Sequence, residues 1–168
     1  MPQVYVSVGS NIDRQRNIAM ALQALAEFYG ELQQSPVYES AAVGFDSAPF
    51  YNLVLGFTTQ DSPQSIQDQL HAIENRCGRQ RTVTLSARTL DLDLLLYDDL
   101  VMKQGKLVLP REDIQRYAFV LRPLAEIAGS MRHPVTGVSF AKMWADFDQE
   151  SQPLVMVEWP PAAGSHGE

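Results

Sequence analysis

Residues 88–97, with the sequence Arg-Thr-Leu-Asp-Leu-Asp-Leu-Leu-Leu-Tyr, decide the fold expected for this chain. From Thr89 to Tyr97 the stretch predicts a β-strand. Side chains alternate along a strand, so one face carries Leu90, Leu92 and Leu94 and the other carries Asp91, Asp93 and Leu95. Two carboxylates therefore point the same way from neighbouring positions of one face.

The pair Asp91 and Asp93 predicts a cation site. Their carboxylates would lie roughly 6–7 Å apart along the strand, and like charges this close repel unless a positive charge lies between them. Mg²⁺ is the natural candidate, because it takes one or two protein carboxylates and completes its shell with water and phosphate oxygens. The preceding Arg88 adds a cation that could hold a phosphate through two hydrogen bonds.

A purely structural role is the alternative for this pair. Charged side chains on the outer face of an edge strand discourage aggregation, and an isolated Asp-x-Asp motif favours that interpretation. Here the pair lies within a leucine run, next to Arg88 and directly after a basic loop. That setting favours a metal and phosphate site.

Length and composition describe a single acidic domain. The chain has 168 residues, 45% of them hydrophobic, and a net charge of −7. This allows a sizeable core and argues against a nucleic-acid-binding surface. Four arginines nevertheless gather in a short stretch: Arg76, Arg79, Arg81 and Arg88. Local positive charge on an acidic protein indicates a site for an anionic small molecule, although composition alone would favour a solvated basic loop.

We expect a cytoplasmic, monomeric protein with no membrane partner. Cys77 is the single cysteine, so no disulfide can form within the chain. The first residues lack a basic segment followed by an apolar run, and no apolar stretch reaches the ~18 residues of a membrane span. Residues 1–159 are expected to form one domain, and residues 160–168 a disordered tail.

The order of predicted elements is typical of a ferredoxin-like fold. Strands are expected at 4–8, 32–38, 53–59 and 89–97, with helices at 13–28 and 62–78. This order predicts an α+β fold with a βαββαβ core, an antiparallel sheet and helices on its faces. A C-terminal extension would add a hairpin at 101–109 around Gln104-Gly105, a polar segment at 110–118, helices at 119–127 and 139–144, and a strand at 154–159.

Several separated motifs together give a resemblance to a known family. They are Val8-Gly9-Ser10-Asn11, Gly44-Phe45, Pro49-Phe50-Tyr51-Asn52, Glu74 with Gly78-Arg79-Gln80-Arg81, and Arg88-Thr89-Leu90-Asp91-Leu92-Asp93. From about Val4 to Trp144 the chain resembles 6-hydroxymethyl-7,8-dihydropterin pyrophosphokinase, an enzyme of folate biosynthesis. The last of these motifs is the most specific.

The resemblance implies an enzyme that binds ATP, two Mg²⁺ ions and the pterin alcohol, and that transfers the terminal pyrophosphate of ATP with release of AMP. It implies that Asp91 and Asp93 hold the metals. The catalytic cations would be Arg79, Arg81 and Arg88. The residues that serve ATP would be His71, Glu74, Lys106, Arg111 and Arg116. The residues at the pterin would be Ser40, Val43, Gly44, Phe50, Asn52 and Phe119.

The chemistry of these side chains agrees with the roles that the resemblance implies. The rings of Phe50 and Phe119 can stack on a flat pterin, and the amide of Asn52 can pair with its donor–acceptor edge. Without the resemblance, both rings would be interpreted as core residues and Asn52 as a strand-entry residue. We also expect the loop 79–87 to close over the triphosphate when ATP and Mg²⁺ bind.

The chain departs from the family pattern at several positions. Arg111 stands where a histidine commonly follows Pro110, and Glu112 comes next. The arginine expected before Phe119 is matched best by Arg116, with Tyr117 in its place; His71 stands where glutamine is common, and the loop 82–87 lacks the usual tryptophan and lysine. A diverged relative that binds pterin or nucleotide without efficient transfer is therefore a second hypothesis, and an interaction domain without a ligand is a third.

Overall fold

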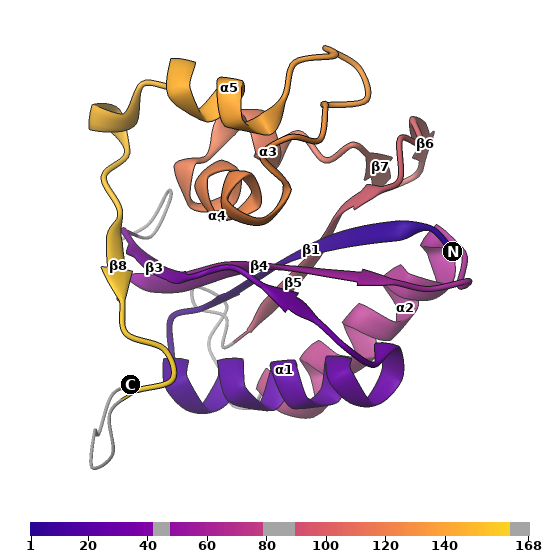
Figure 1. The fold of residues 1–168 in the computed structure, drawn as a ribbon. Helices are drawn as coiled ribbons and strands as arrows, with labels where there is room; N and C mark the ends of the chain where they lie inside the picture. The colour runs from indigo at the N-terminus through magenta and orange to yellow at the C-terminus, as the bar shows by residue number, and fades with distance from the viewer. Residues whose placement is uncertain (42–47, 79–89, 162–168) are drawn as a thin grey trace.

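A computed structural model describes residues 1–41, 48–78 and 90–161. One antiparallel sheet lies between two layers of helices (Figure 1). The elements in chain order are β1 (Gln3–Ser10), α1 (Arg14–Tyr29), β2 (Gln33–Gln34), β3 (Val37–Ser40), β4 (Phe50–Thr58), α2 (Pro63–Ile73), the π-helical turn η1 (Glu74–Gly78), β5 (Asp91–Tyr97), β6 (Met102–Gln104), β7 (Leu107–Leu109), α3 (Asp113–Arg116), α4 (Ala118–Ala128), α5 (Phe140–Asp146), the 3₁₀ turn η2 (Gln149–Ser151) and β8 (Val155–Val157).

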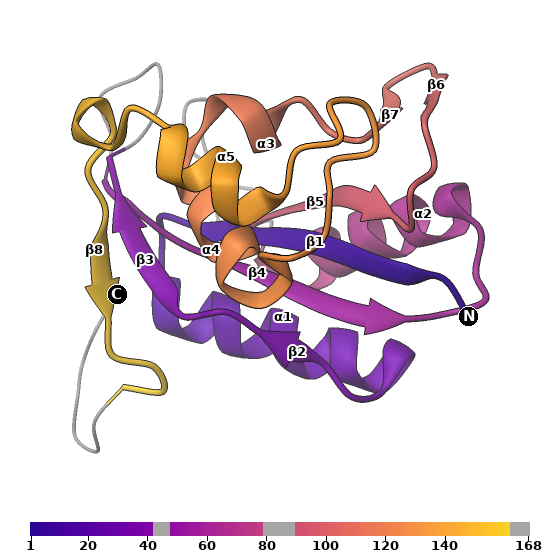
Figure 2. The same ribbon diagram turned by 45° about the horizontal axis from the view of Figure 1, so that its top comes forward.

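The sheet has the strand order of a ferredoxin-like core. Its neighbours run β5-β1-β4-β3-β8, and β2 pairs with β4 beside β3. Every pairing is antiparallel, with α1 connecting β1 to β2 and α2 connecting β4 to the segment before β5. The α+β fold and antiparallel sheet predicted from the sequence are confirmed. The added edge strand β8 lies beside β3 (Figure 2).

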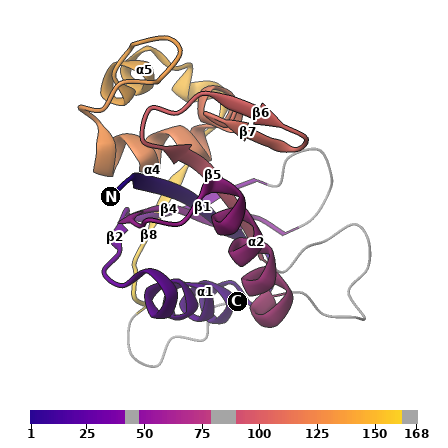
Figure 3. The same ribbon diagram turned by 90° about the vertical axis from the view of Figure 1, so that its right-hand side faces the viewer.

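Alternation along the strands gives the sheet two apolar faces. One face packs against α1 and α2, and its core includes Val6, Leu53 and Leu92 from three neighbouring strands. The other face packs against α4, and α5 lies over α4 (Figure 3). The core on this side includes Tyr5, Val54 and Leu95 together with residues of α4 and Phe140 of α5. As predicted, Leu90, Leu92 and Leu94 belong to the first core, and Leu95 belongs to the second.

A β-bulge interrupts the alternation of β5. The register changes so that Tyr5 pairs with Leu96 and Val6 pairs with Leu94, which leaves Leu95 as an extra residue. Both Leu95 and Leu96 therefore join the core under α4, while Tyr97 packs against the opposite core. The bulge lies beyond Asp93, so both aspartates keep the regular register of β5.

Local capping residues set the ends of several elements. The Ser62 side chain accepts a hydrogen bond from the Ser65 amide at the start of α2, where Pro63 occupies the first turn. Ser139 caps α5 in the same way. The hairpin of β6 and β7 forms as predicted, although its turn is Gly105-Lys106 rather than Gln104-Gly105. Gly105 has a φ of 61°, which favours glycine.

The main differences from the predicted boundaries lie in three segments. The strand expected at 32–38 is divided by Ser35-Pro36, and the Ser35 hydroxyl there accepts a hydrogen bond from the Val54 amide. The strand expected at 53–59 begins earlier, at Phe50. The segment 110–118, expected to be polar and irregular, contains α3 and the start of α4. Most of the tail at 160–168 lies outside the described residues.

Within residues 1–41, 48–78 and 90–161, no helix combines the length and apolar character that crossing a membrane would need.

Candidate functional site

A row of paired residues crosses three neighbouring strands and connects the predicted metal and pterin positions. Gly9 of β1 pairs with Asp91 of β5 on one side and with Asn52 of β4 on the other. Directly paired residues share a face of a sheet, and adjacent strands lie ~4.8 Å apart, so the backbones of Asp91 and Asn52 lie about 10 Å apart. The acid pair, Asp91 and Asp93, and the predicted pterin residues Phe50 and Asn52 thus lie on the same face, at the end of the sheet where β5 begins.

Gly9 leaves room between these two groups. A side-chain carbon at this position would lie 3.1 Å from Asn52 Oδ1 and 3.6 Å from Cδ2 of the Phe50 ring. The first distance is shorter than ordinary van der Waals contact, so any larger residue would displace the Asn52 amide. Glycine at position 9 therefore leaves space above β1 for the side chains of Phe50 and Asn52.

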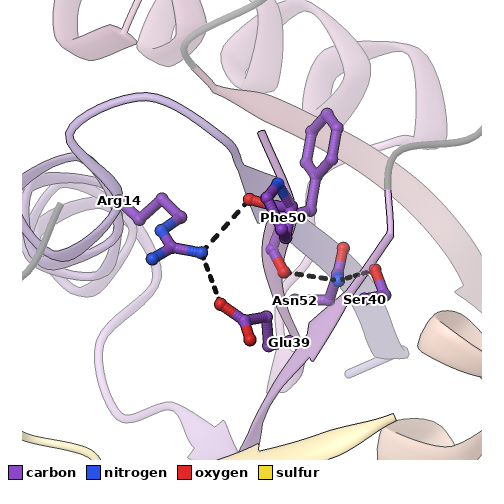
Figure 4. Close-up of polar contacts among 6 residues, drawn as sticks. Arg14, Glu39, Ser40, Phe50 and Asn52 are labelled. Atoms are coloured by element: carbon purple, nitrogen blue, oxygen red, sulfur yellow. Dashed lines mark hydrogen bonds and ion pairs between the residues drawn. The ribbon is translucent and has the colours of Figure 1, made fainter. Parts of the chain in front are cut away.

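The Asn52 amide is held in one orientation by its neighbours. Its Nδ2 donates to Ser40 Oγ at 2.7 Å and to the Phe50 carbonyl at 3.5 Å (Figure 4). Asn52 and Ser40 are both buried, whereas Phe50 is half-buried and its ring points away from Arg14 (Figure 4). A buried amide beside a partly exposed ring suits a flat heterocycle with polar atoms on one edge.

Arg14 ties together the two strands that carry these residues. Its Nη1 donates to Glu39 Oε2 at 2.7 Å and to the Pro49 carbonyl at 3.2 Å (Figure 4). Its guanidinium lies 3.9 Å from the centre of the Tyr51 ring. The Arg14 side chain is only 14% exposed. It therefore joins the end of β3, where Ser40 lies, to the start of β4, where Phe50 and Asn52 lie.

The guanidinium of Arg111 lies beside the acid pair Asp91 and Asp93. Arg111 Nη2 lies 3.6 Å from Asp93 Oδ1, and Arg111 Nε lies 3.2 Å from Asp113 Oδ2. The Arg111 amide donates to the Leu95 carbonyl, which fixes the backbone of Arg111 against β5. Burial alone would lower the pKa of the Arg111 guanidinium, but Asp93, Asp113 and Asp91 outweigh it and raise that pKa.

Among the described residues, these ion pairs lack hydrogen-bond geometry. Arg111 Nε is buried and makes no hydrogen bond to any of them, and the Nη2 distance to Asp93 is too long for one. Arg111 is thus held to Asp93 and Asp113 by charge attraction. A turn toward a phosphate would exchange these ion pairs for another one.

Glu74 contacts the backbone of β5 between Asp91 and Asp93. Its carboxylate is buried, and Oε2 accepts a hydrogen bond of 2.7 Å from the Leu92 amide, which lies between the two aspartates. Glu74 begins the π-helical turn η1 that follows α2, a distortion often found at functional sites. The structure therefore ties Glu74 to the backbone between Asp91 and Asp93, and the contact of Glu74 with ATP that the resemblance implies stays a prediction.

The third part of the site is a pair of stacked rings at the start of α4. Tyr117 and Phe119 lie with their ring centres 4.9 Å apart and their planes 13° apart. They line a pocket of about 320 Å³. Its other lining residues are Ala41, Ser151, Gln152, Pro153 and Leu154. Ala41 follows Ser40 in the chain, so this pocket adjoins the segment that ends β3.

The remaining predicted site residues are dispersed or undescribed. His71 on α2 and Lys106 in the turn between β6 and β7 are exposed. Arg116 is exposed and pairs with Glu112 at 3.2 Å. The predicted residues Val43, Gly44, Arg79, Arg81 and Arg88, and the predicted closing loop 79–87, lie outside the described residues.

Sequence reasoning gave no role to three residues that shape the site. Gly9 belongs to the motif Val8-Gly9-Ser10-Asn11, but its pairing with Asn52 and Asp91 follows only from the register of β1 with β4 and β5. Arg14 looks like any charged residue on a helix, and no local signal reveals its bond to Glu39. Tyr117 was noted only as a departure, although its ring extends the aromatic surface of Phe119.

The donor set is suitable for Mg²⁺. Asp91 and Asp93 lie two residues apart on one face of β5, and carboxylate oxygens are the ligands that this ion prefers. Mg²⁺ commonly binds through one or two carboxylates and takes its other ligands from water and substrate phosphates. Asp91 and Asp93 would hold it.

The fold and the site together define a class. The ferredoxin-like domain presents the Asp91 and Asp93 carboxylates, with Arg111 beside them, and the Asn52 amide with the Phe50 ring on one face of its sheet. Side chains of these kinds suit an anionic cosubstrate and a flat heterocycle. Comparison of the sequence agrees with this class: the profile of the 7,8-dihydro-6-hydroxymethylpterin-pyrophosphokinase family matches residues 5–129. The chain belongs to this family, and the resemblance predicted from its motifs is confirmed.

Individual relatives extend the likeness. The 2-amino-4-hydroxy-6-hydroxymethyldihydropteridine pyrophosphokinase of Aquifex aeolicus is 35% identical over 137 residues, which cover 80% of this chain and 86% of that protein. The folic acid synthesis protein fol1 of Pneumocystis carinii is 32% identical over 156 residues, 90% of this chain. The chain spans only 21% of that longer protein.

A solved structure shares the fold. The Plasmodium falciparum HPPK-DHPS triple mutant with SDX-DHP superimposes with a TM-score of 0.71 at 13% identity, covering 86% of this chain and 44% of that one. This likeness supports the ferredoxin-like architecture derived above from the strand order.

Proposed function

We propose that this protein transfers pyrophosphate from ATP to 6-hydroxymethyl-7,8-dihydropterin, giving AMP and the pterin pyrophosphate, in folate biosynthesis. The observation that carries the proposal is the row Asp91–Gly9–Asn52. It sets Asp91, the proposed metal ligand, and the buried Asn52 on one face of the sheet, with their backbones about 10 Å apart. That span suits a pterin whose hydroxymethyl group reaches toward the phosphates of a metal-bound nucleotide.

The reaction needs alignment more than a protein nucleophile. The hydroxymethyl oxygen of the pterin attacks the β-phosphorus of ATP, the bond from that phosphorus to the oxygen of the α-phosphate breaks, AMP leaves with the electron pair, and the hydroxyl proton passes to solvent. Holding the two substrates in line supplies much of the rate enhancement. Mg²⁺, two ions of which are expected, would neutralise charge on the phosphate oxygens.

Each part of the site has a role in this proposal. Asp91 and Asp93 hold the metal, and Glu74 fixes the strand between them. Arg111 would exchange Asp93 for a phosphate oxygen once the metal has bound. His71, Lys106 and Arg116 would serve ATP, and Arg79, Arg81 and Arg88 would stabilise charge on the transferred group; these roles rest on the family resemblance.

The pterin would lie between Phe50 and Phe119, with its polar edge at Asn52 and Ser40. The Asn52 amide keeps Oδ1 available toward the Gly9 side, while Nδ2 is occupied by Ser40. Val43 and Gly44 would contribute backbone groups. Both substrates are small molecules, and we propose that the protein acts as a monomer in the cytoplasm, a compartment that suits a chain with the single cysteine Cys77.

One observation favours a second candidate, a pterin- or nucleotide-binding protein with weak transfer. Arg111 stands beside Asp93, where the family pattern has a histidine, and a permanent cation at 3.6 Å competes with a metal for that carboxylate. An Arg111 that stays with Asp93 in the presence of ATP would slow the transfer.

An assay of AMP formation tests the proposal. Purified protein with ATP, MgCl₂ and the pterin alcohol should form AMP and the pterin pyrophosphate in equal amounts, and label from both the β- and γ-phosphates should appear in the pterin product. Calorimetric binding of both ligands without AMP formation would support the second candidate. Absence of binding to either ligand would refute both.

A further inference from the structure

The junction between α3 and α4 carries the stacked rings of Tyr117 and Phe119. Tyr117 is the single residue between the two helices, and its backbone is extended, with φ −122° and ψ 127°. Its carbonyl accepts hydrogen bonds from the Val120 and Leu121 amides, and its amide donates one to the Asp113 carbonyl. The Ala118 amide and the Arg116 carbonyl, on either side of Tyr117, find their partner in a distant segment of the chain.

Gln152 supplies these partners from a distant segment. Its Oε1 accepts a hydrogen bond of 2.9 Å from the Ala118 amide, the first residue of α4. Its Nε2 donates a hydrogen bond of 2.9 Å to the Arg116 carbonyl, at the end of α3. One side-chain amide thus bridges the residues on either side of Tyr117 and fixes the direction in which the Tyr117 and Phe119 rings point.

The segment that carries Gln152 is anchored by the pairing of β8 with β3. Three residues further on, Val155 begins β8, which pairs with Val37, Tyr38 and Glu39 of β3. The same strand β3 leads into Ser40 and Ala41. Gln152, Pro153 and Leu154 line the pocket of about 320 Å³ together with Tyr117, Phe119 and Ala41. Figure 2 shows β8 along the outer edge of the sheet beside β3.

We propose that Gln152 is a positioning residue that holds the aromatic wall of the pterin pocket, an inference that rests on the proposed function. It acts through the Arg116 carbonyl and the Ala118 amide, not by touching the substrate. The segment lies beyond residues 5–129, the range that the family profile matches, so the role belongs to the C-terminal part of this chain.

The consequence is specific to one substrate. Without the Gln152 amide, the junction can rotate and the Phe119 ring no longer stays parallel to a pterin stacked on Phe50. The acid pair and Arg111 are anchored separately, through Glu74 and the Leu95 carbonyl. Pterin affinity should fall while ATP affinity persists.

Two substitutions and a matched control test this role. Gln152→Ala removes both hydrogen bonds, and we expect the dissociation constant and KM of the pterin to rise about 3- to 10-fold, with KM for ATP unchanged. Gln152→Glu keeps an acceptor for the Ala118 amide at the start of a helix, where a negative charge is favourable, and loses the donor to Arg116. Its pterin affinity should lie between those of Gln152→Ala and the unchanged protein.

Gln149→Ala is the control. Gln149 lies in the same segment, and its Nε2 donates one hydrogen bond of 2.9 Å to the Trp144 carbonyl, away from the α3–α4 junction. Its pterin KM should match that of the unchanged protein. Hydrogen exchange at the Ala118 amide should be faster in Gln152→Ala than in Gln149→Ala.

The outcomes separate this inference from the proposed function. If the unchanged protein binds no pterin, the proposed function is wrong and the positioning role is wrong with it. If the unchanged protein binds pterin and Gln152→Ala binds it equally well, only the positioning role is wrong. An equal rise in KM for ATP and for the pterin would likewise overturn it, because that result indicates a general loss of structure.

Discussion

Replacing Arg111 by glutamine should strengthen the binding of a divalent cation to the protein without nucleotide. The guanidinium lies beside Asp93 and Asp113, so it repels any cation that approaches the same carboxylates. Arg111→Gln removes this charge and keeps much of the side-chain volume. The backbone bond from the Arg111 amide to the Leu95 carbonyl does not depend on the side chain, so the local fold should persist.

The size of the effect follows from the geometry. A separation of 3.6 Å between Arg111 Nη2 and Asp93 Oδ1 corresponds to about 1 kcal/mol in water and about 4–5 kcal/mol at an effective dielectric constant of ~20. Both side chains are about a third exposed, at 32% and 36%, so screening by solvent reduces the interaction to about 1–2 kcal/mol. Cation affinity should therefore rise roughly 5- to 30-fold.

Mn²⁺ binding measured by electron paramagnetic resonance at low salt gives the affinity directly. Arg132→Gln is the matched control, because it removes the same charge from an exposed arginine whose bond goes to the Gly137 carbonyl, and it should leave Mn²⁺ affinity unchanged. The affinity of Arg111→Gln for ATP with Mg²⁺ should fall, since a phosphate ligand is lost. Unchanged or weaker Mn²⁺ binding in Arg111→Gln would refute the competition between Arg111 and the metal.

Five further substitutions test other parts of the site. Asp91→Asn or Asp93→Asn should lower activity by orders of magnitude with the fold retained; near-normal turnover at limiting Mg²⁺, in an AMP assay, would contradict the metal assignment. Phe50→Ala should weaken pterin binding by about 1–3 kcal/mol and leave ATP affinity nearly unchanged; calorimetry showing equal losses for both ligands would indicate a core role instead. Gly9→Ala should weaken pterin binding by about 1–3 kcal/mol by displacing the Asn52 amide, which calorimetry with the pterin would detect. Arg14→Ala removes a largely buried charged hydrogen bond worth about 2 kcal/mol and should lower the melting temperature by about 4–8 °C. Scanning calorimetry that shows no shift would mean that Arg14 does not stabilise the junction between β3 and β4.

The sequence predicted the parts of the fold that depend on local periodicity. The alternation in residues 88–97 placed Leu92 and Asp93 on opposite faces, and the order of strands and helices led to the antiparallel ferredoxin-like sheet; both are confirmed. The bulge at Leu95 was not foreseen, because it arises from the register between β5 and β1 rather than from either strand alone. The predicted start of β4 was wrong for a similar reason, because Phe50 belongs to β4 through its pairing with Ser40.

Two of the residues that sequence reasoning missed have partners that lie far away along the chain. Arg14 reaches Glu39 and Pro49, and Gln152 reaches Arg116 and Ala118. No spacing or composition signals such contacts, because side chains on different elements meet only after the chain has folded. The Arg111–Asp93 pair belongs to the same group, although the substitution that creates it was visible in the sequence.

The position of Arg111 couples the two ligands of the proposed reaction. The Arg111 guanidinium lies 3.6 Å from Asp93 and 3.2 Å from Asp113, and Asp91 also raises its pKa. In the proposed reaction, a metal bound at Asp93 would weaken the attraction between Asp93 and Arg111, and a nucleotide phosphate would offer Arg111 another anion. A phosphate bound by Arg111 would in turn reduce the competition between Arg111 and the metal for Asp93. Each ligand would therefore strengthen the binding of the other, and this coupling must be reciprocal. In this proposal, Arg111 favours the joint binding of metal and nucleotide over the binding of either alone.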